Sequence, residues 1–283
     1  MIDRNRATGS LLGLAVGDAV GATNEFEMAP APIDDMVGGG PFHLAAGEWT
    51  DDTSMALCLA ESLKAYKGFN GLDVMNRFLL WWRQGYMSVL GYCFDIGNAT
   101  KAALQRFEKT GVYFAGNPDP EVAGNGSLMR LAPIPILFWK DLTKTKENAI
   151  AQSLLTHAAP VCLECCQTYA MLIHRALHGQ SKQDILSGVH VPSRREDVEP
   201  SGYVLESMHA ALYCFANTDT FRDGCLMAAN FGGDADTIAA IYGQLAGAYY
   251  GESGIPSEWL NRLSWSEEIR KTAIKLAEIG EEL

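Results

Sequence analysis

The sequence predicts an all-α fold in a single domain that spans residues 1–283. Apolar residues recur at helical spacing through most of the chain, as at Met55, Leu59 and Leu63. Period-two alternation, which predicts half-buried strands, is scarce, and the Asn-Gly dipeptide at 125–126 precedes a helical pattern instead of joining two strands. No repeat, low-complexity stretch or linker marks a domain boundary. We therefore expect one helical domain with its chemistry on the loops.

The helical patterns follow one another along the chain. The first, at 4–20, is rich in small residues, and its Gly9, Gly13 and Gly17 recur at four-residue spacing that lets another helix approach closely. The long stretch 21–49 is loop-like and leads directly into an acidic cluster, which favours a functional loop. Further helices are predicted at 54–66, 73–83, 98–109, 127–139, 144–156, 161–177, 202–216, 220–229, 237–250 and 266–281.

Composition and charge narrow the functional classes. Hydrophobic residues make up 48% and charged residues 20% of the chain, which is typical of a globular protein, and no apolar run reaches the roughly 18 residues of a membrane helix. The formal net charge of -12 would repel nucleic acid phosphates, so we do not expect nucleic acid as a stable partner. The seven cysteines lack the spacing of a disulfide framework, so we expect a cytoplasmic protein.

The stretch Gly232-Gly233-Asp234-Ala235-Asp236-Thr237 carries the strongest pattern. In an extended segment, Asp234 and Asp236 would point to the same side, and two carboxylates held close together favour a cation between them. The alternative is helix capping, because Asp and Thr are favoured at helix starts. Capping explains one Asp and Thr237 well, but it explains the second Asp poorly.

A second oxygen-rich cluster, Thr50-Asp51-Asp52-Thr53, also precedes an apolar helical pattern. Capping is again an alternative, but two such clusters favour a shared metal site that includes Thr50, Asp51 and Asp52. Carboxylate and hydroxyl ligands suit Mg²⁺ or Mn²⁺ better than Zn²⁺. The four Asp residues of the two clusters would be enough for two ions, which together can orient and activate a water molecule.

Other candidate site residues are weaker when taken singly. Glu25 is either a site carboxylate or a solvated loop acid, and Gly97 follows an Asp-Ile pair before a helix. Residues 124–127, Gly124-Asn125-Gly126-Ser127, are either a phosphate-binding turn before a helix or a simple turn. His157 lies at a predicted helix end, where a packed or capping role is the alternative.

Taken in order, these motifs resemble those of the ADP-ribosylglycohydrolase family, which includes the dinitrogenase reductase-activating glycohydrolases, the ADP-ribosyl-acceptor hydrolases and the J1 crystallins. Each motif is similar to a family motif at the corresponding place, and the resemblance runs from about residue 8 to 251. The motifs are Gly17-Asp18-Ala19-Val20-Gly21 with Glu25, Thr50-Asp51-Asp52-Thr53, Asp95-Ile96-Gly97 with Thr100, Gly124 to Arg130, Thr156-His157, and Gly232 to Thr237.

The resemblance implies a single-domain orthogonal helical bundle with a binuclear Mg²⁺ or Mn²⁺ centre in a cleft. It implies metal ligands at Thr50, Asp51, Asp52, Asp234, Asp236 and Thr237. Glu25, Asp234 and Asp236 become the candidate catalytic groups, and the ADP-ribose cleft would be lined by Gly97, Gly124, Asn125, Gly126, Ser127 and His157. The implied reaction is hydrolysis of the bond between ribose C1″ and an acceptor, on an ADP-ribosylated protein or a small ADP-ribose conjugate. We expect the protein to be a monomer.

The Asp-Ile-Gly form of the motif at 95–97 is similar to that of the bacterial, arginine-linkage hydrolases, which favours an arginine-linked acceptor. In the serine-linkage hydrolases of animals, an aromatic residue that helps hold adenine precedes the Gly-Asn-Gly loop, but Ala123 stands there in this chain. Adenine contacts would then come from Tyr113, Phe114 or Tyr203. Two alternatives stay open: a two-metal nucleotide phosphohydrolase, and a non-catalytic ADP-ribose-binding or structural relative. The first usually places Glu pairs inside helices, whereas this chain places Asp residues at helix starts.

Overall fold

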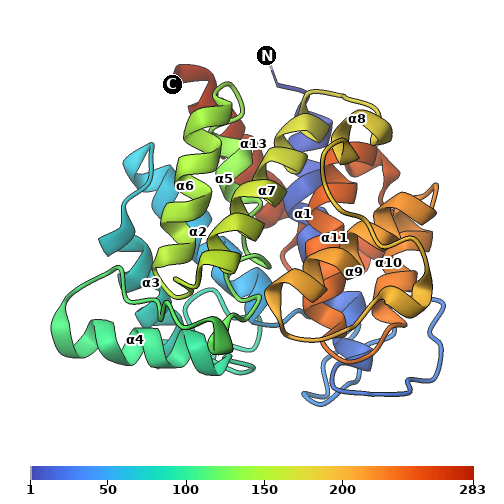
Figure 1. Cartoon of the computed structure of the whole chain (residues 1–283), viewed down its shortest axis with the longest axis horizontal. Coiled ribbons are helices and arrows are strands. Elements are labelled where there is room, and N and C mark those ends of the chain that lie inside the picture. The colour runs from blue at the N-terminus through green and yellow to red at the C-terminus, as the bar shows by residue number, and fades with distance from the viewer. Residues whose placement is uncertain (1) are drawn as a thin grey trace.

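The computed structural model describes residues 2–283, and within that range the chain forms helices and no β-strand. The predicted all-α fold is therefore confirmed. Figure 1 shows the helices crossing one another at varied angles around a central pair, α1 and α11. The longer helices are α1 (Arg4–Gly21), α2 (Asp51–Tyr66), α3 (Gly71–Gln84), α4 (Asn98–Thr110), α6 (Leu142–Leu154), α7 (Pro160–Leu177), α9 (Val204–Asn217), α10 (Phe221–Ala229), α11 (Ala235–Tyr250) and α13 (Ser266–Glu282).

Glycines allow the two central helices to pack in close contact. Helices α1 and α11 run antiparallel, and their backbones approach so closely that a Cβ atom added at Gly13 would lie 2.2 Å from the carbonyl oxygen of Gly243. The same Cβ at Gly17 would lie 2.0 Å from the carbonyl oxygen of Ala239. The predicted close helix contact is thus confirmed. It brings the end of α1 beside the start of α11, where the motif at 232–237 lies.

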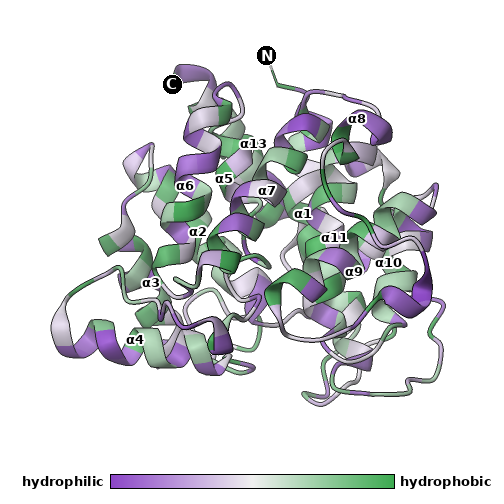
Figure 2. Ribbon diagram, in the orientation of Figure 1, coloured by the Kyte–Doolittle hydropathy of each residue, from purple (hydrophilic) through white to green (hydrophobic). Residues whose placement is uncertain are grey.

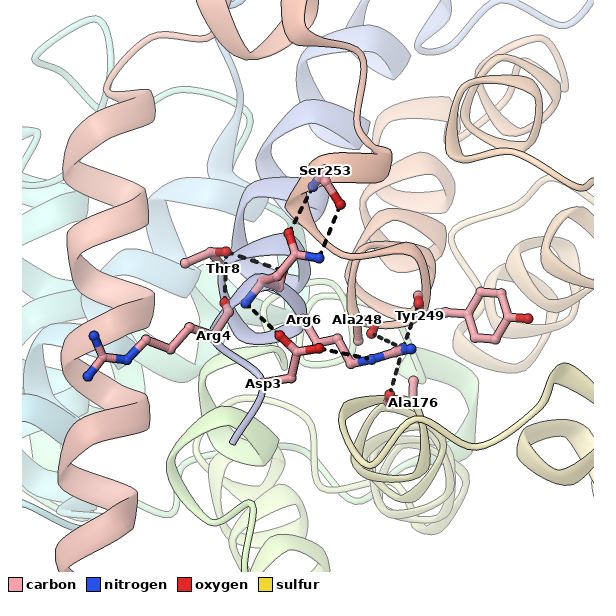
Figure 3. Close-up of polar contacts among 9 residues, drawn as sticks. Asp3, Arg4, Arg6, Thr8, Ala176, Ala248, Tyr249 and Ser253 are labelled. Carbon is pink, nitrogen blue, oxygen red and sulfur yellow. Dashed lines mark hydrogen bonds and ion pairs between the residues drawn. The ribbon is translucent and has the colours of Figure 1, made fainter. Parts of the chain in front are cut away.

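The opposite end of this pair is fixed by polar contacts (Figure 3). The guanidinium of Arg6 donates to three backbone carbonyls, those of Ala176 (3.1 Å), Ala248 (3.1 Å) and Tyr249 (2.6 Å). These carbonyls belong to the last turns of α7 and α11, where helical N–H donors run out, although the Ala176 carbonyl also accepts from the Gly179 N–H (2.9 Å). The half-buried Arg6 side chain therefore joins three helices, α1, α7 and α11, at the end that lies away from the acidic motif.

The other helices cover this pair and complete the core. Helices α9, α10 and α7 pack against α11, and α13 packs against α1 and α2. Figure 2 shows hydrophobic residues along α11 and mainly hydrophilic residues along α4, which lies at the edge of the molecule. None of the helices within residues 2–283 is long and apolar enough to cross a membrane.

Several helix boundaries differ from the predicted ones. The predicted helix at 127–139 is reduced to α5 (Pro133–Leu137), because prolines 133 and 135 have no N–H group to donate and favour a helix start. The short helices α8 (Lys182–Leu186) and α12 (Ser257–Arg262) were too brief for a periodic pattern to indicate. Helices α2 and α11 begin earlier than predicted, so Asp51, Asp52 and Asp236 lie in their first turns.

The glycine contact makes a testable prediction. Replacing Gly13 by Ala forces α1 and α11 apart, because the new methyl group would meet the backbone of Gly243. Overpacking of this kind costs about 1–3 kcal/mol, which outweighs the better helix propensity of Ala. Thermal unfolding should therefore begin at a temperature several degrees lower. The matched control is Gly68→Ala, because the nearest atom to an added Cβ there lies 3.9 Å away. An unchanged melting temperature for Gly13→Ala would contradict the packing argument.

Candidate metal centre and ligand cleft

The starts of α2 and α11 meet, and their oxygen atoms converge. Thr50, the residue before α2, places its hydroxyl oxygen 3.1 Å from Asp52 Oδ2 and 3.3 Å from Asp236 Oδ2. From α11, the Thr237 hydroxyl lies 3.4 Å from the same Asp52 oxygen. The two oxygen-rich motifs, far apart in sequence, therefore form one cluster.

The Asp18 carboxylate holds the Thr50 and Thr53 part of this cluster in place. Its carboxylate accepts hydrogen bonds from the Thr50 N–H (2.8 Å) and hydroxyl (3.0 Å), and from the Thr53 N–H (3.0 Å) and hydroxyl (2.6 Å). Asp18 lies in the last turns of α1 and is fully buried. It therefore fixes the start of α2 to the central helix pair. The sequence interpretation gave Asp18 no role, although an acidic residue within an apolar helix of small residues would have indicated one.

The cluster is suited to a divalent cation. Carboxylate oxygens of Asp18, Asp52 and Asp236 lie within 4.8 Å of one another, as do those of Glu25, Asp95 and Asp236. Three buried oxygens, Asp52 Oδ1, Asp236 Oδ1 and Glu25 Oε2, have no hydrogen-bond partner among the described residues. A buried acceptor without a partner is costly, and hard cations prefer oxygen ligands of this kind. Asp236 belongs to both groups, so it would be the natural bridge between two ions.

The electrostatics of the cluster favour the same conclusion. Burial raises the pKa of Asp51, Asp52 and Asp236 well above the ordinary range, and the charges of neighbouring carboxylates raise it further. Burial, followed by the charges of Asp95 and Asp234, raises the pKa of Glu25 to about 10. Without a cation, these groups cannot all be charged together.

Asp95 is a second residue to which the sequence interpretation gave no role. Burial and the charge of Asp234 raise its pKa to about 7. Its backbone has a φ of 54°, a conformation that residues other than glycine seldom adopt. The sequence pattern predicts a site role for Gly97 of the Asp-Ile-Gly motif at 95–97 but not for Asp95.

A cleft of about 1110 Å³ opens above the cluster. It is large enough for a ligand of nucleotide size. Its wall includes acidic residues of the cluster and most of the residues that the sequence placed in an ADP-ribose cleft. These residues are Glu25, Asp51, Asp95, Asp234, Thr237, Gly97, Gly124, Asn125, Gly126 and His157.

Thr50, Asp52 and Asp236 lie beneath this wall and are fully or almost fully buried. Ser127 lies behind it, because its hydroxyl is buried and lies 2.8 Å from Ser153 Oγ. Its side chain therefore does not face the cleft.

Asn125 joins the cleft wall to the acidic cluster. Its side-chain amide donates to Asp234 Oδ2 (2.7 Å) and to Ser207 Oγ (2.9 Å). This pair of bonds fixes which oxygen of Asp234 remains free to face the cluster. Of the three aromatic residues considered for adenine, Tyr203 lines the cleft, whereas Tyr113 and Phe114 are not part of its wall.

Comparison with known proteins places this arrangement in a family. The sequence model of the ADP-ribosylglycohydrolases matches residues 1–282. The chain belongs to the ADP-ribosylglycohydrolase family. A solved structure titled "ADP-ribosylglycohydrolase-related protein complex" superposes with a TM-score of 0.84 at 38% sequence identity, covering 98% of both chains.

Named relatives of this glycohydrolase are themselves hydrolases. "ADP-ribosylarginine hydrolase Tri1" of Pseudomonas putida is 45% identical over 96% of this chain and 78% of its own length. "ADP-ribosyl-[dinitrogen reductase] glycohydrolase" of Rhodospirillum rubrum is 34% identical over 93% of this chain and 92% of its own length. The expected family is confirmed, and the protein is an enzyme of this hydrolase family.

The raised carboxyl pKa values predict a dependence of stability on pH and metal. Between about pH 7 and about pH 9, the folded metal-free glycohydrolase keeps protons on groups such as Glu25 that the unfolded chain has lost. Because the unfolded state then binds fewer protons, stability falls as pH rises. Bound Mg²⁺ would offset the negative charge of the carboxylates, so the groups would no longer need to be protonated in the folded state. We expect chelated protein to melt at progressively lower temperature across this range, and Mg²⁺ to raise the melting temperature more at the higher pH.

Differential scanning fluorimetry with chelator and with Mg²⁺ measures both effects. Asp236→Asn removes one charge from the cluster and should reduce the difference between the two samples. A Mg²⁺ effect that is equal at both ends of the pH range would argue against the carboxylate cluster as the metal site.

Proposed function

We propose that this glycohydrolase releases ADP-ribose from arginine side chains, with two Mg²⁺ or Mn²⁺ ions as cofactors. The observation that carries the proposal is the cluster of buried, unpartnered carboxylate oxygens at the base of a cleft of about 1110 Å³. The arginine linkage is supported by relatives at 45% and 42% identity that are both named ADP-ribosylarginine hydrolase.

The ions would be held by Thr50, Asp51, Asp52, Asp234, Asp236 and Thr237. When bound, such ions supply positive charge that orients the ribose hydroxyls and lowers the pKa of a water molecule. Asp18 and Asn125 would keep this ligand set in place, since outer-shell hydrogen bonds orient metal ligands.

The carboxyl groups beside the metal ligands are suited to proton transfer. Glu25 and Asp95 lie close to each other and to Asp236, and both line the cleft. Asp95 and Glu25 each present a carboxyl group to the cleft, where it can hold or release a proton beside the ligand, as a general acid or base does. Asp234, Asp236 and Glu25 remain candidates for the same role. The surrounding negative charge would also favour an oxocarbenium-like transition state at ribose C1″.

The exposed acids of the cleft lining suit a cationic acceptor. Glu121 and Glu199 are exposed and line the cleft together with Arg106, whose guanidinium donates to the Ala115 carbonyl. An arginine acceptor presents positive charge to these acids, whereas a serine acceptor gains nothing from them. The position before the Gly-Asn-Gly loop, Ala123, offers no aromatic ring there.

The activity is tested with a panel of defined substrates. Purified protein is incubated with arginine-linked and serine-linked ADP-ribosyl peptides in Mg²⁺, Mn²⁺ or chelator, and released ADP-ribose is measured by chromatography. We expect release from the arginine-linked peptide with either metal and little release with chelator. Equal release in chelator would contradict metal dependence, and preference for the serine-linked peptide would contradict the acceptor assignment.

The same panel separates the two alternatives. A two-metal nucleotide phosphohydrolase would release phosphate or AMP from free ADP-ribose or nucleotides. A binding protein would take up ADP-ribose in calorimetry without turnover.

Removing one carboxylate tests the metal ligands. Asp236→Asn takes a charge from the residue shared by both acidic groups, so affinity for at least one ion should fall by a factor of roughly 100 or more. Activity at a fixed Mn²⁺ concentration should fall accordingly and recover only in part at high Mn²⁺. The matched control is Glu278→Gln, a surface acid on α13. Wild-type Mn²⁺ dependence in Asp236→Asn would refute this ligand assignment.

A further inference from the structure

A buried arginine behind the cleft has no carboxylate partner among the described residues. Arg130 is fully buried, and its guanidinium donates to the Gln152 side chain (3.0 Å), the Gln152 carbonyl (3.0 Å) and the Thr156 hydroxyl (2.9 Å). It also lies 4.7 Å from the centre of the Phe78 ring. Arginine is seldom fully buried without an ion pair, so a charge retained here requires an explanation.

The hydrogen bond from Arg130 to Thr156 determines which way the bond between Thr156 and His157 can run. Arginine can only donate, so the Thr156 oxygen accepts from Arg130. The same oxygen lies 2.8 Å from His157 Nδ1. Within residues 2–283, the Thr156 hydroxyl has no hydrogen-bond partner other than Arg130 and His157. If Nδ1 carried a hydrogen, the Thr156 hydroxyl hydrogen would be buried without an acceptor, which is costly. The Thr156 hydroxyl therefore donates to Nδ1, and the ring hydrogen lies on Nε2.

That Nε2–H group faces the ligand cleft across a loop of glycines. A Cβ atom added at Gly124 would lie 3.5 Å from His157 Nε2, and one added at Gly126 would lie 3.2 Å from it. The glycines thus leave the imidazole edge accessible, and His157 is part of the cleft wall. Within the described part of the chain Nε2 has no hydrogen-bond partner, so its hydrogen is available to a ligand.

The ring also stays uncharged. Burial, followed by the positive charge of Arg130, lowers the pKa of His157 to about 3. The groups around the ring are otherwise uncharged: the Thr100 hydroxyl, the glycines of the loop and the backbone of α6. A neutral imidazole with one fixed hydrogen donates at Nε2 and cannot accept there.

We propose that Arg130 and Thr156 are positioning residues that hold His157 as a neutral Nε2–H donor to an oxygen atom of the ligand, either a phosphate oxygen or a ribose oxygen. The identity of that ligand rests on the proposed function, whereas the fixed tautomer does not. The guanidinium would thus determine how the cleft binds its ligand without touching the ligand.

Nitrogen NMR of protein labelled with ¹⁵N-histidine tests the tautomer directly. The chain has six histidines, and the His157 signals are those lost in His157→Asn. In the wild-type protein we expect the hydrogen on Nε2 and an unprotonated Nδ1. Thr156→Val keeps the shape of the side chain but removes its hydroxyl, so both tautomers should appear. Thr156→Ser restores the hydroxyl and should restore the wild-type spectrum.

Calorimetry with ADP-ribose tests the role of the donor. Thr156→Val should bind ADP-ribose roughly tenfold more weakly, and Thr156→Ser should bind as the wild type does. A wild-type spectrum with the hydrogen on Nδ1 would overturn the proposal without any variant. An unchanged tautomer in Thr156→Val, or unchanged ADP-ribose affinity in a variant whose tautomer has changed, would overturn it as well. If the wild type binds no ADP-ribose, the proposed function fails, and the nitrogen spectrum still decides the tautomer.

Discussion

The contact between α1 and α11 is the constraint on which the site depends. Glycines along α1 let the two backbones meet at a distance that no side chain would permit. The contact continues to Gly21, where an added Cβ would lie 2.4 Å from the carbonyl oxygen of Ala235, the first residue of α11. It therefore sets the position of Asp18 relative to Asp236, and through Asp18 it also sets the start of α2. The proposed metal ligands, which lie on loops and in first turns of helices, are thus aligned by a rigid helix pair.

The acidic cluster destabilises the metal-free fold, whereas the packing of α1 against α11 stabilises it. Its carboxylates are buried close together, and several of their oxygens have no hydrogen-bond partner within residues 2–283. Groups with such strongly raised pKa values usually mark a functional site, since a fold gains nothing from unpaired buried acids. The surrounding bonds compensate only in part: Asp18 is satisfied by the two threonines, and Asp234 by Asn125. Divalent cations would complete the compensation.

Much of this arrangement could be predicted from the sequence, because it rests on local patterns. Helical periodicity indicated the fold class, and glycine at four-residue spacing indicated the close helix contact. The clusters around Asp51 and Asp236 indicated oxygen ligands.

What the sequence could not indicate are contacts that depend on three dimensions. Asp18 looked like one polar residue near a helix end, yet it bonds to residues more than thirty positions away, as with Thr50. Asp95 depends on a positive φ, and Ser127 turns inward because its loop folds against α6.

The most direct test of the account is anomalous diffraction from crystals grown with Mn²⁺. We expect two manganese peaks inside the acidic cluster, with Asp236 in contact with both and Thr50, Asp52 and Thr237 around them. A cluster without anomalous density at saturating Mn²⁺ would contradict it, and so would a single peak elsewhere on the surface.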